Sequence, residues 1–90
     1  MRISNSKKEK ISEQILLLLY SQTPKSLFTS YIAKEIARDE EFTKDILIEL
    51  KNKKLIIGIK KNPKGVDYKK RIRWKLSDEA YQAYKQHQIN

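Results

Sequence analysis

Residues 55–76 have the sequence LIIGIKKNPKGVDYKKRIRWKL, and this stretch decides the fold. The segment from Leu55 to Ile59 is short, apolar and rich in isoleucine, which predicts a strand. Asn62-Pro63-Lys64-Gly65 predicts a turn, because proline presets φ while asparagine and glycine tolerate positive φ. Residues 68–76 then alternate with a period of two, which is typical of a strand with two different faces. The stretch therefore predicts a β-hairpin.

The two faces of the return strand carry different side chains. One face is mainly apolar, with Lys70 among its members near the tip: Tyr68, Ile72, Trp74 and Leu76. The other face is entirely basic: Lys69, Arg71, Arg73 and Lys75. Alternate residues of a strand are about 6.6 Å apart, which is close to the roughly 6–7 Å between phosphates along one DNA strand. We expect the apolar face to pack on the core and the basic face to contact phosphates.

The positive charge of the protein is concentrated around this hairpin. The 90 residues include 20 Lys and Arg against 11 Asp and Glu, for a net charge of +9. Residues 51–75 contain eleven basic side chains and one acidic one, whereas residues 38–50 contain two basic and five acidic ones. This concentration predicts a polyanionic partner. Ninety residues make one domain, and domains of this size have little stability to spare and often dimerise.

A long helix is predicted near the start of the chain. Ser6-Lys7-Lys8-Glu9 has the pattern of a capping box. Apolar residues follow at helical spacing from Ile11 to Leu19, and Pro24 predicts an end near Gln22. Residues 25–28 are compatible with a short extended segment.

Three shorter helices complete the prediction. Thr29 or Ser30 is expected to cap a helix that ends near Ala37, with Ile32, Ala33 and Ile36 inward. Asp39 is expected to cap the next helix, which starts with Glu40 and Glu41 and runs to Asn52 or Lys53. Its inward residues are predicted to be Phe42, Ile46, Leu47 and Leu50. Ser77-Asp78-Glu79 should cap a last helix from Ala80 to about His87, with Tyr81 and Tyr84 packed on the hairpin or on a partner helix.

The order helix, helix, helix, hairpin, helix resembles the winged helix-turn-helix. Residues 32–37 (IAKEIA), with Leu47, Leu50 and Leu55-Ile56, resemble the pattern of the MarR-, PadR- and ArsR-type regulators. Residues 73–80 (RWKLSDEA) resemble the junction of those regulators between wing and final helix. The resemblance departs at Arg38, where the family usually has an aliphatic residue, and at Lys54, where it usually has glycine.

This resemblance covers about residues 8–88 and implies a mainly α fold with a β-hairpin wing (α+β). We expect a single winged helix-turn-helix domain over residues 1–90. Within it, residues 1–6 would form a basic N-terminal arm and residues 77–90 a C-terminal helix.

The resemblance further implies a sequence-specific protein that binds double-stranded DNA and regulates transcription, as a homodimer. Three sets of residues are then candidate DNA contacts. The wing set, expected to hold phosphates, consists of Lys60, Lys61, Lys64, Lys69, Lys70, Arg71, Arg73 and Lys75. The set from the recognition helix and the preceding turn consists of Arg38, Thr43 and Lys44. The N-terminal arm contributes Arg2, Lys7 and Lys8.

The recognition helix is unusually acidic, with Glu40, Glu41, Asp45 and Glu49 on it. Phosphates repel carboxylates, and although a carboxylate can accept from cytosine N4, three or four of them cannot all do so. Three arrangements remain open. The helix enters the groove through Arg38, Thr43 and Lys44, or it sits shallowly while the wing and arm supply the affinity, or it faces another subunit. The alternative functions are a plasmid- or virus-type partition or replication protein, and a protein-interaction module with only non-specific DNA affinity.

Other chemistries have little support in the sequence. The chain has no cysteine, only two glycines and a single histidine, so it lacks a thiolate metal site and a glycine-rich phosphate loop. The adjacent acids at 40–41 and 78–79 are explained by helix capping. We expect no enzyme activity, no cofactor and no small-molecule ligand. No apolar run approaches the length that spans a bilayer, and the first residues lack the apolar region of a secretion signal. We therefore expect a cytoplasmic protein with no membrane partner.

Overall fold

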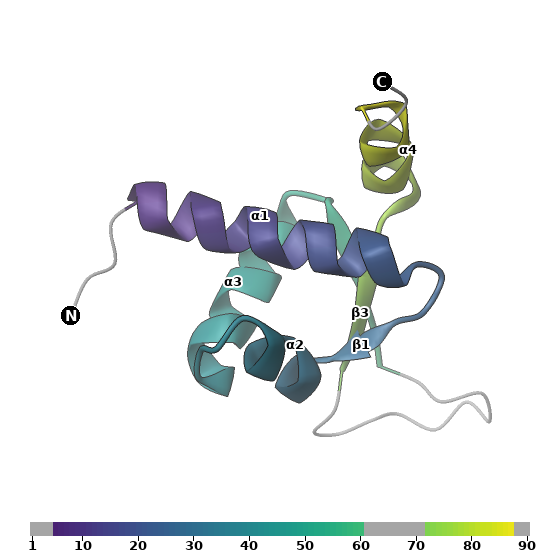
Figure 1. The fold of residues 1–90 in the computed structure, drawn as a ribbon. Coiled ribbons are helices and arrows are strands. Elements are labelled where there is room, and N and C mark those ends of the chain that lie inside the picture. Colours follow the sequence, from purple (N-terminus) through teal and green to yellow (C-terminus); the bar gives the residue numbers. More distant parts are fainter. Residues whose placement is uncertain (1–4, 61–71, 88–90) are drawn as a thin grey trace.

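The structure, a computed structural model, describes residues 5–60 and 72–87 of the chain (Figure 1). Its elements follow in the order α1 (Asn5–Gln22), β1 (Leu27–Phe28), α2 (Thr29–Glu35), α3 (Glu40–Asn52), β2 (Ile56–Ile59), β3 (Arg73–Leu76) and α4 (Asp78–His87). This confirms the predicted mainly helical fold with a wing, and the short extended segment expected within residues 25–28 is the strand β1. The predicted turn at residues 62–65 and the strand residues 68–71 lie outside the described residues.

The three strands form one antiparallel sheet in the order β1-β3-β2. Strand β3 is therefore central, with Leu27 opposite Trp74 on one side and Gly58 opposite Trp74 on the other. The predicted alternation holds along β3, because Trp74 and Leu76 are buried while Arg73 and Lys75 are only partly buried. In Figure 1, α1 crosses above α2 and α3, and α4 stands at the opposite end of the molecule from α2.

Helix α1 begins at Asn5, one residue before the serine that was expected to cap it. Ser6 therefore lies inside the first turn, and its prediction as the N-cap is wrong. The predicted end is confirmed at Gln22, where the Thr23 hydroxyl donates to the carbonyl oxygen of Leu19 at 2.8 Å. The buried face of the helix consists of Ile11, Ile15, Leu16 and Leu19, whereas Leu17 is exposed.

Helix α2 differs from its prediction at both ends. Its N-cap is Phe28, which makes no side-chain capping bond, and Thr29 is already the first helical residue. Neither Thr29 nor Ser30 is the N-cap. The helix ends at Glu35 rather than near Ala37, because Ala37 adopts a left-handed conformation with φ 56°.

Helix α3 matches its prediction closely. The Asp39 carboxylate accepts a hydrogen bond from the backbone N–H of Phe42 at 2.7 Å, as expected of an N-cap. Ile46, Leu47 and Leu50 are buried as predicted, and Phe42 is partly buried against the same core. The helix ends at Asn52.

The core lies between α1, the sheet and the α2–α3 pair. Its largest fully buried side chain is Trp74, with only 1% of its surface exposed. The Trp74 indole packs directly over the backbone of Gly58, where an added Cβ would lie 3.1 Å from Cζ3 of the ring. Gly58 therefore allows this close approach, since a side chain there would require the indole to shift by a few tenths of an ångström.

Helix α4 is capped as predicted, because the Ser77 hydroxyl accepts a hydrogen bond from the N–H of Ala80 at 3.2 Å. Tyr81 and Tyr84 pack on Tyr20 of α1, with ring centroids 5.5 and 5.8 Å away. The structure therefore places both rings against α1, an element that the prediction did not name. The Tyr84 hydroxyl also donates to the Glu13 carboxylate at 3.5 Å. No helix in the described part of the chain has the length and apolar character needed to cross a membrane.

Candidate nucleic-acid interface

Helices α2 and α3 and the turn between them form a helix-turn-helix. Ala37 occupies the left-handed position after α2, where its N–H donates to Lys34 O at 3.2 Å and the N–H of Arg38 donates to Ala33 O at 3.0 Å. This pair of hydrogen bonds is the Schellman motif. It ends α2 sharply and places Asp39 at the start of α3.

Helix α3 ends in the same way. Lys54 is left-handed with φ 64°, its N–H donates to Lys51 O at 2.9 Å, and the N–H of Leu55 donates to Leu50 O at 3.0 Å. Glycine is favoured at this position because it has no Cβ. The resemblance had placed a glycine at Lys54, and the backbone here has the conformation that such a glycine adopts.

The exposed side of α3 carries acids and one large apolar residue. With Thr43, Ile46, Leu47 and Leu50 buried, the opposite side of the helix is formed by Glu41, Asp45, Ile48 and Asn52. Ile48 is 41% exposed and is the large apolar side chain on this side of α3. Ile48 was not among the residues predicted from the sequence. Its position opposite the buried stripe was the signal that could have found it.

Thr43 was predicted to reach the DNA, and the structure corrects this. Its side chain is fully buried, and its hydroxyl donates to the backbone carbonyl of Asp39 at 2.8 Å. The residue helps to anchor the first turn of α3 and faces away from the exposed side. A threonine hydroxyl in a helix can donate a hydrogen bond to the carbonyl oxygen four residues earlier. The sequence pattern alone did not distinguish this role from a contact with a DNA base.

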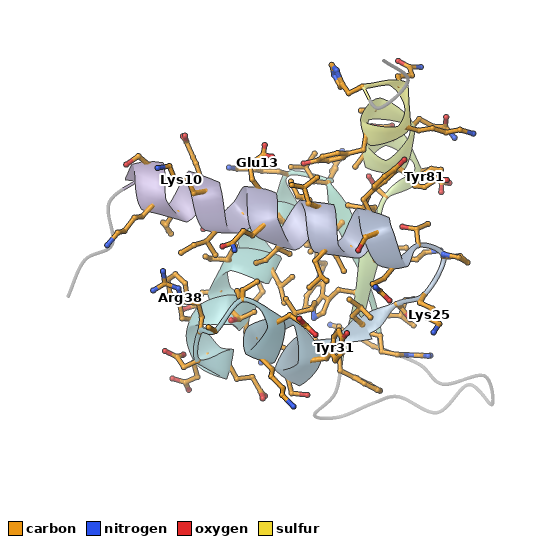
Figure 2. All side chains as sticks on the ribbon, viewed as in Figure 1. Lys10, Glu13, Lys25, Tyr31, Arg38 and Tyr81 are labelled. Atoms are coloured by element: carbon orange, nitrogen blue, oxygen red, sulfur yellow. The ribbon has the colours of Figure 1, made fainter. Side chains whose placement is uncertain are left out.

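The other two residues predicted for this element are accessible. Arg38 is exposed in the turn, and its guanidinium carbon lies 6.0 Å from the ring centroid of Phe42, at the limit of a cation–π contact. Lys44 is exposed one turn into α3. Figure 2 shows Arg38 at the end of the molecule where α3 begins, and Tyr31 on the exposed side of α2.

The basic residues assigned to an N-terminal arm lie partly in a helix. Lys7 and Lys8 belong to α1, so they are not part of an extended arm, and Arg2 is outside the described residues. Lys8 Nζ forms an ion pair with Glu49 Oε2 of α3 at 3.2 Å, with both side chains about half exposed. One of the four acidic side chains of α3, Glu49, therefore has a basic partner within the same chain.

The basic face of the wing is less uniform than predicted. Phe28 and Ile59 lie opposite Arg73 on the two neighbouring strands, and Ile57 lies opposite Lys75. Side chains opposite each other in a sheet share a face, so this face is mixed apolar and basic. The Arg73 side chain is only partly exposed and its Nε atom is fully buried. Lys75 is also partly buried, whereas Lys60, just after β2, is exposed.

The remaining wing residues predicted for DNA contact cannot be placed, because they lie outside the described residues: Lys61, Lys64, Lys69, Lys70 and Arg71. The structure does bring exposed lysines to the end of α3 next to β2. Lys51, Lys53 and Lys54 are all exposed there, close in sequence to Lys60. Cations at a helix C-terminus are also favoured by the helix dipole.

Two tyrosines in the described part of the chain have perturbed pKa values. The Glu35 carboxylate, by hydrogen bonding and by its charge, raises the pKa of Tyr31 above the usual 10.0. Burial raises the pKa of Tyr84, and the Glu13 carboxylate adds to this effect. Within residues 5–60 and 72–87 no three His, Cys, Asp or Glu side chains come together as a metal site would require.

No protein-family model matches the chain, and no curated protein matches its sequence. Solved structures do match. MepR of S. aureus, in complex with DNA, has a TM-score of 0.72 at 22% identity, over 94% of this chain and 61% of that one. ZitR of Lactococcus lactis, a zinc-responsive MarR family member, has a TM-score of 0.66 at 18% identity, over 97% of this chain and 52% of that one.

A third match is a shorter protein of Ralstonia eutropha to which DNA binding is ascribed. It has a TM-score of 0.68 at 17% identity, over 88% of this chain and 95% of that one. In contrast, the chain matches only about half to three fifths of the length of the MepR and ZitR chains. Together these similarities show that the chain has the winged helix-turn-helix fold found in MarR-type regulators.

Proposed function

We propose that the protein is a transcriptional regulator that binds double-stranded DNA sequence-specifically and holds the phosphates with its basic wing. The fold supports this, because MepR has the same fold and was solved in complex with DNA. The resemblance of residues 32–56 and 73–80 to MarR-, PadR- and ArsR-type patterns points in the same direction.

The observation that carries the proposal is the position of the charge relative to the helix-turn-helix. Eleven of the 20 basic residues lie in residues 51–75, and the described ones begin at the end of α3 and continue into the wing. In this fold, α3 is followed directly by β2, the first strand of the wing, and packs against it. Polyanion binding by such a surface releases counterions, which makes it strongly dependent on salt.

The proposal includes two copies of the chain on one pseudo-palindromic site. A dimer would bring two wings to one duplex and double the number of phosphate contacts. Small domains also gain stability by association. Light scattering on the isolated protein and on its DNA complex gives the stoichiometry directly, and a 1:1 complex under saturating protein would overturn this part.

The experiment that tests the phosphate contacts is a salt titration of DNA affinity. Each lost phosphate contact reduces the slope of log affinity against log salt by about 0.9. We expect the triple variant Lys60→Ala, Lys69→Ala, Lys75→Ala to flatten the slope by about two units or more. Arg73 is left unchanged, because its buried Nε means that its replacement would also disturb the fold.

A matched control removes the same kind of charge away from the wing. Lys10 on α1 and Lys85 on α4 are both exposed, and Figure 2 shows Lys10 pointing away from α3. The variant Lys10→Ala, Lys85→Ala should keep the slope of the unaltered protein. An equal slope in the wing variant and the unaltered protein would exclude the wing as the phosphate contact.

One observation favours a second function. Glu41, Asp45 and exposed Ile48 together form an acidic and apolar surface that could bind another protein instead of DNA. The protein would then be an interaction module with only non-specific DNA affinity. Titration of random and of selected duplexes at near-physiological salt separates the two, since a specificity ratio above about a thousand indicates a regulator. A plasmid- or virus-type partition or replication protein would share the DNA contacts and differ in the process that it serves.

A further inference from the structure

The four acids of α3 have different surroundings. Glu40 and Glu41 lie in the first turn beside the capped helix start, where the helix dipole favours negative charge. Glu49 is paired with Lys8. Among residues 5–60 and 72–87 the Asp45 carboxylate has no hydrogen bond and no ion pair. Asp45 is therefore the acid for which the fold itself offers no role.

Asp45 and Ile48 are neighbours on the exposed side of α3. Residues three apart lie on the same side of a helix, and both of these side chains are exposed, Ile48 by 41%. Their Cα atoms are separated by about 4.5 Å along the helix axis, which is close to the roughly 3.4 Å between successive base pairs. Side chains at this spacing can contact adjacent base pairs when the helix lies along the major groove.

We propose that Asp45 and Ile48 read two adjacent base pairs in the major groove, a cytosine and a thymine. The Asp45 carboxylate would accept a hydrogen bond from the N4 amino group of cytosine, the base donor that suits a carboxylate in the major groove. Ile48 would contact the C5 methyl group of the neighbouring thymine, the apolar group that the major groove presents. This inference rests on the proposed function and specifies the DNA that it recognises.

The flanks of α3 are consistent with this orientation. Lys44 and Lys51 are exposed and seven residues apart, which places them on the same flank of the helix, beside the stripe of Asp45 and Ile48. When the stripe faces the base edges, this flank faces a phosphate backbone. The Asp45 carboxylate then meets an amino group, and the ammonium groups of Lys44 and Lys51 meet phosphates. These contacts offset part of the repulsion between DNA and Glu41, which lies on the same side of α3.

The first experiment selects bound duplexes from a random pool with fixed flanks, using the full-length protein. We expect a CT or TC step in the enriched site. The thymine of that step is then replaced by deoxyuridine, which removes the methyl group and keeps every hydrogen-bonding group. Loss of one buried methyl corresponds to about a fourfold loss of affinity.

The variant Ile48→Ala tests whether Ile48 is the group that senses the methyl. It should bind the thymine and deoxyuridine duplexes equally, whereas the unaltered protein prefers thymine. The matched control is Leu17→Ala, since Leu17 is 45% exposed on α1 and away from α3. This control should keep the fourfold preference for thymine. A preference for thymine that persists in Ile48→Ala overturns the assignment of Ile48.

The variant Asp45→Asn tests the second contact by a change of preference, which loss of folding could not produce. Asparagine pairs with adenine in the major groove, so the selected base at that position should change from cytosine to adenine by about fivefold or more. Retained preference for cytosine overturns the assignment of Asp45. If the protein binds every duplex equally, the proposal that α3 recognises specific bases is overturned, whereas the phosphate contacts are not. If the protein binds no DNA, the proposed function is overturned as well.

Discussion

The indole Nε1 of Trp74 donates a 2.8 Å hydrogen bond to Oγ1 of Thr29, across 45 residues of sequence. This contact joins the central strand β3 to the first residue of α2. It thereby ties the wing to the helix-turn-helix, so that the two halves of the candidate interface keep one relative position. The same bond satisfies the polar atom of the largest buried side chain of the core.

Removal of this acceptor should destabilise the protein. Thr29→Val keeps the shape of the side chain and leaves the Trp74 N–H without its partner, which costs about 1–3 kcal/mol of unfolding free energy. Thr29→Ser keeps the hydroxyl and should lose less. Urea denaturation followed by the fluorescence of Trp74 measures both variants. Equal midpoints for Thr29→Val and the unaltered protein would show that water replaces the hydroxyl without cost.

A side chain at Gly58 should also destabilise the fold. An added Cβ would lie 3.1 Å from the Trp74 ring and 3.2 Å from Cγ2 of Ile72. Because both neighbours are held in packed positions, we expect Gly58→Ala to lower the unfolding free energy by about 1–3 kcal/mol. Thermal unfolding measures the effect. Ile57→Ala, at the exposed neighbouring position, is the control and should change the melting temperature much less.

Replacement of Lys54 by glycine should stabilise the protein. Lys54 has φ 64° in the Schellman motif that ends α3, a conformation that costs a residue with Cβ about 1 kcal/mol. Lys54→Gly should therefore raise the unfolding free energy by up to about 1 kcal/mol. The adjacent control is Lys53→Gly, where φ is −82° and glycine only adds freedom to the unfolded chain. A lower melting temperature for Lys54→Gly than for Lys53→Gly would contradict the argument.

Stability should fall at high pH partly because of Tyr84. Burial and the Glu13 carboxylate raise the pKa of Tyr84 above 10.0 in the folded protein. A raised pKa means that the unfolded chain loses this proton first, so the contribution of Tyr84 is complete below pH 10.0 and is lost as the pH rises through the folded pKa. Tyr84→Phe should remove this part of the alkaline loss. Urea denaturation between about pH 9 and pH 11.5 measures the difference.

A weaker alkaline effect is expected when only the neighbouring charge is removed. Glu13→Gln leaves the burial of Tyr84 unchanged and abolishes the repulsion of tyrosinate by the carboxylate. Its loss of stability above pH 10.0 should lie between those of the unaltered protein and Tyr84→Phe. Identical alkaline profiles for all three proteins would exclude Tyr84 as a contributor.

Several features could be predicted because their causes act within a few residues. The Asp39 cap depends on a carboxylate and an N–H three residues later, and the alternation of β3 depends only on the geometry of a strand. The buried stripe of α3 follows from helical spacing. The sequence therefore determined the order of the elements, the bounds of α3, the cap of α4 by Ser77 and the inward position of Trp74.

Other features depend on residues that are distant in sequence, and only the tertiary structure decided them. Thr29 was expected to cap α2, but its hydroxyl accepts from Trp74, 45 residues away. Arg73 was expected to lie on a purely basic face, but two neighbouring strands place Phe28 and Ile59 beside it. Tyr81 and Tyr84 pack on Tyr20, which no local pattern indicates. Local hydrogen bonds and periodicity are encoded within one element, whereas the partner of a surface is set by how the elements pack.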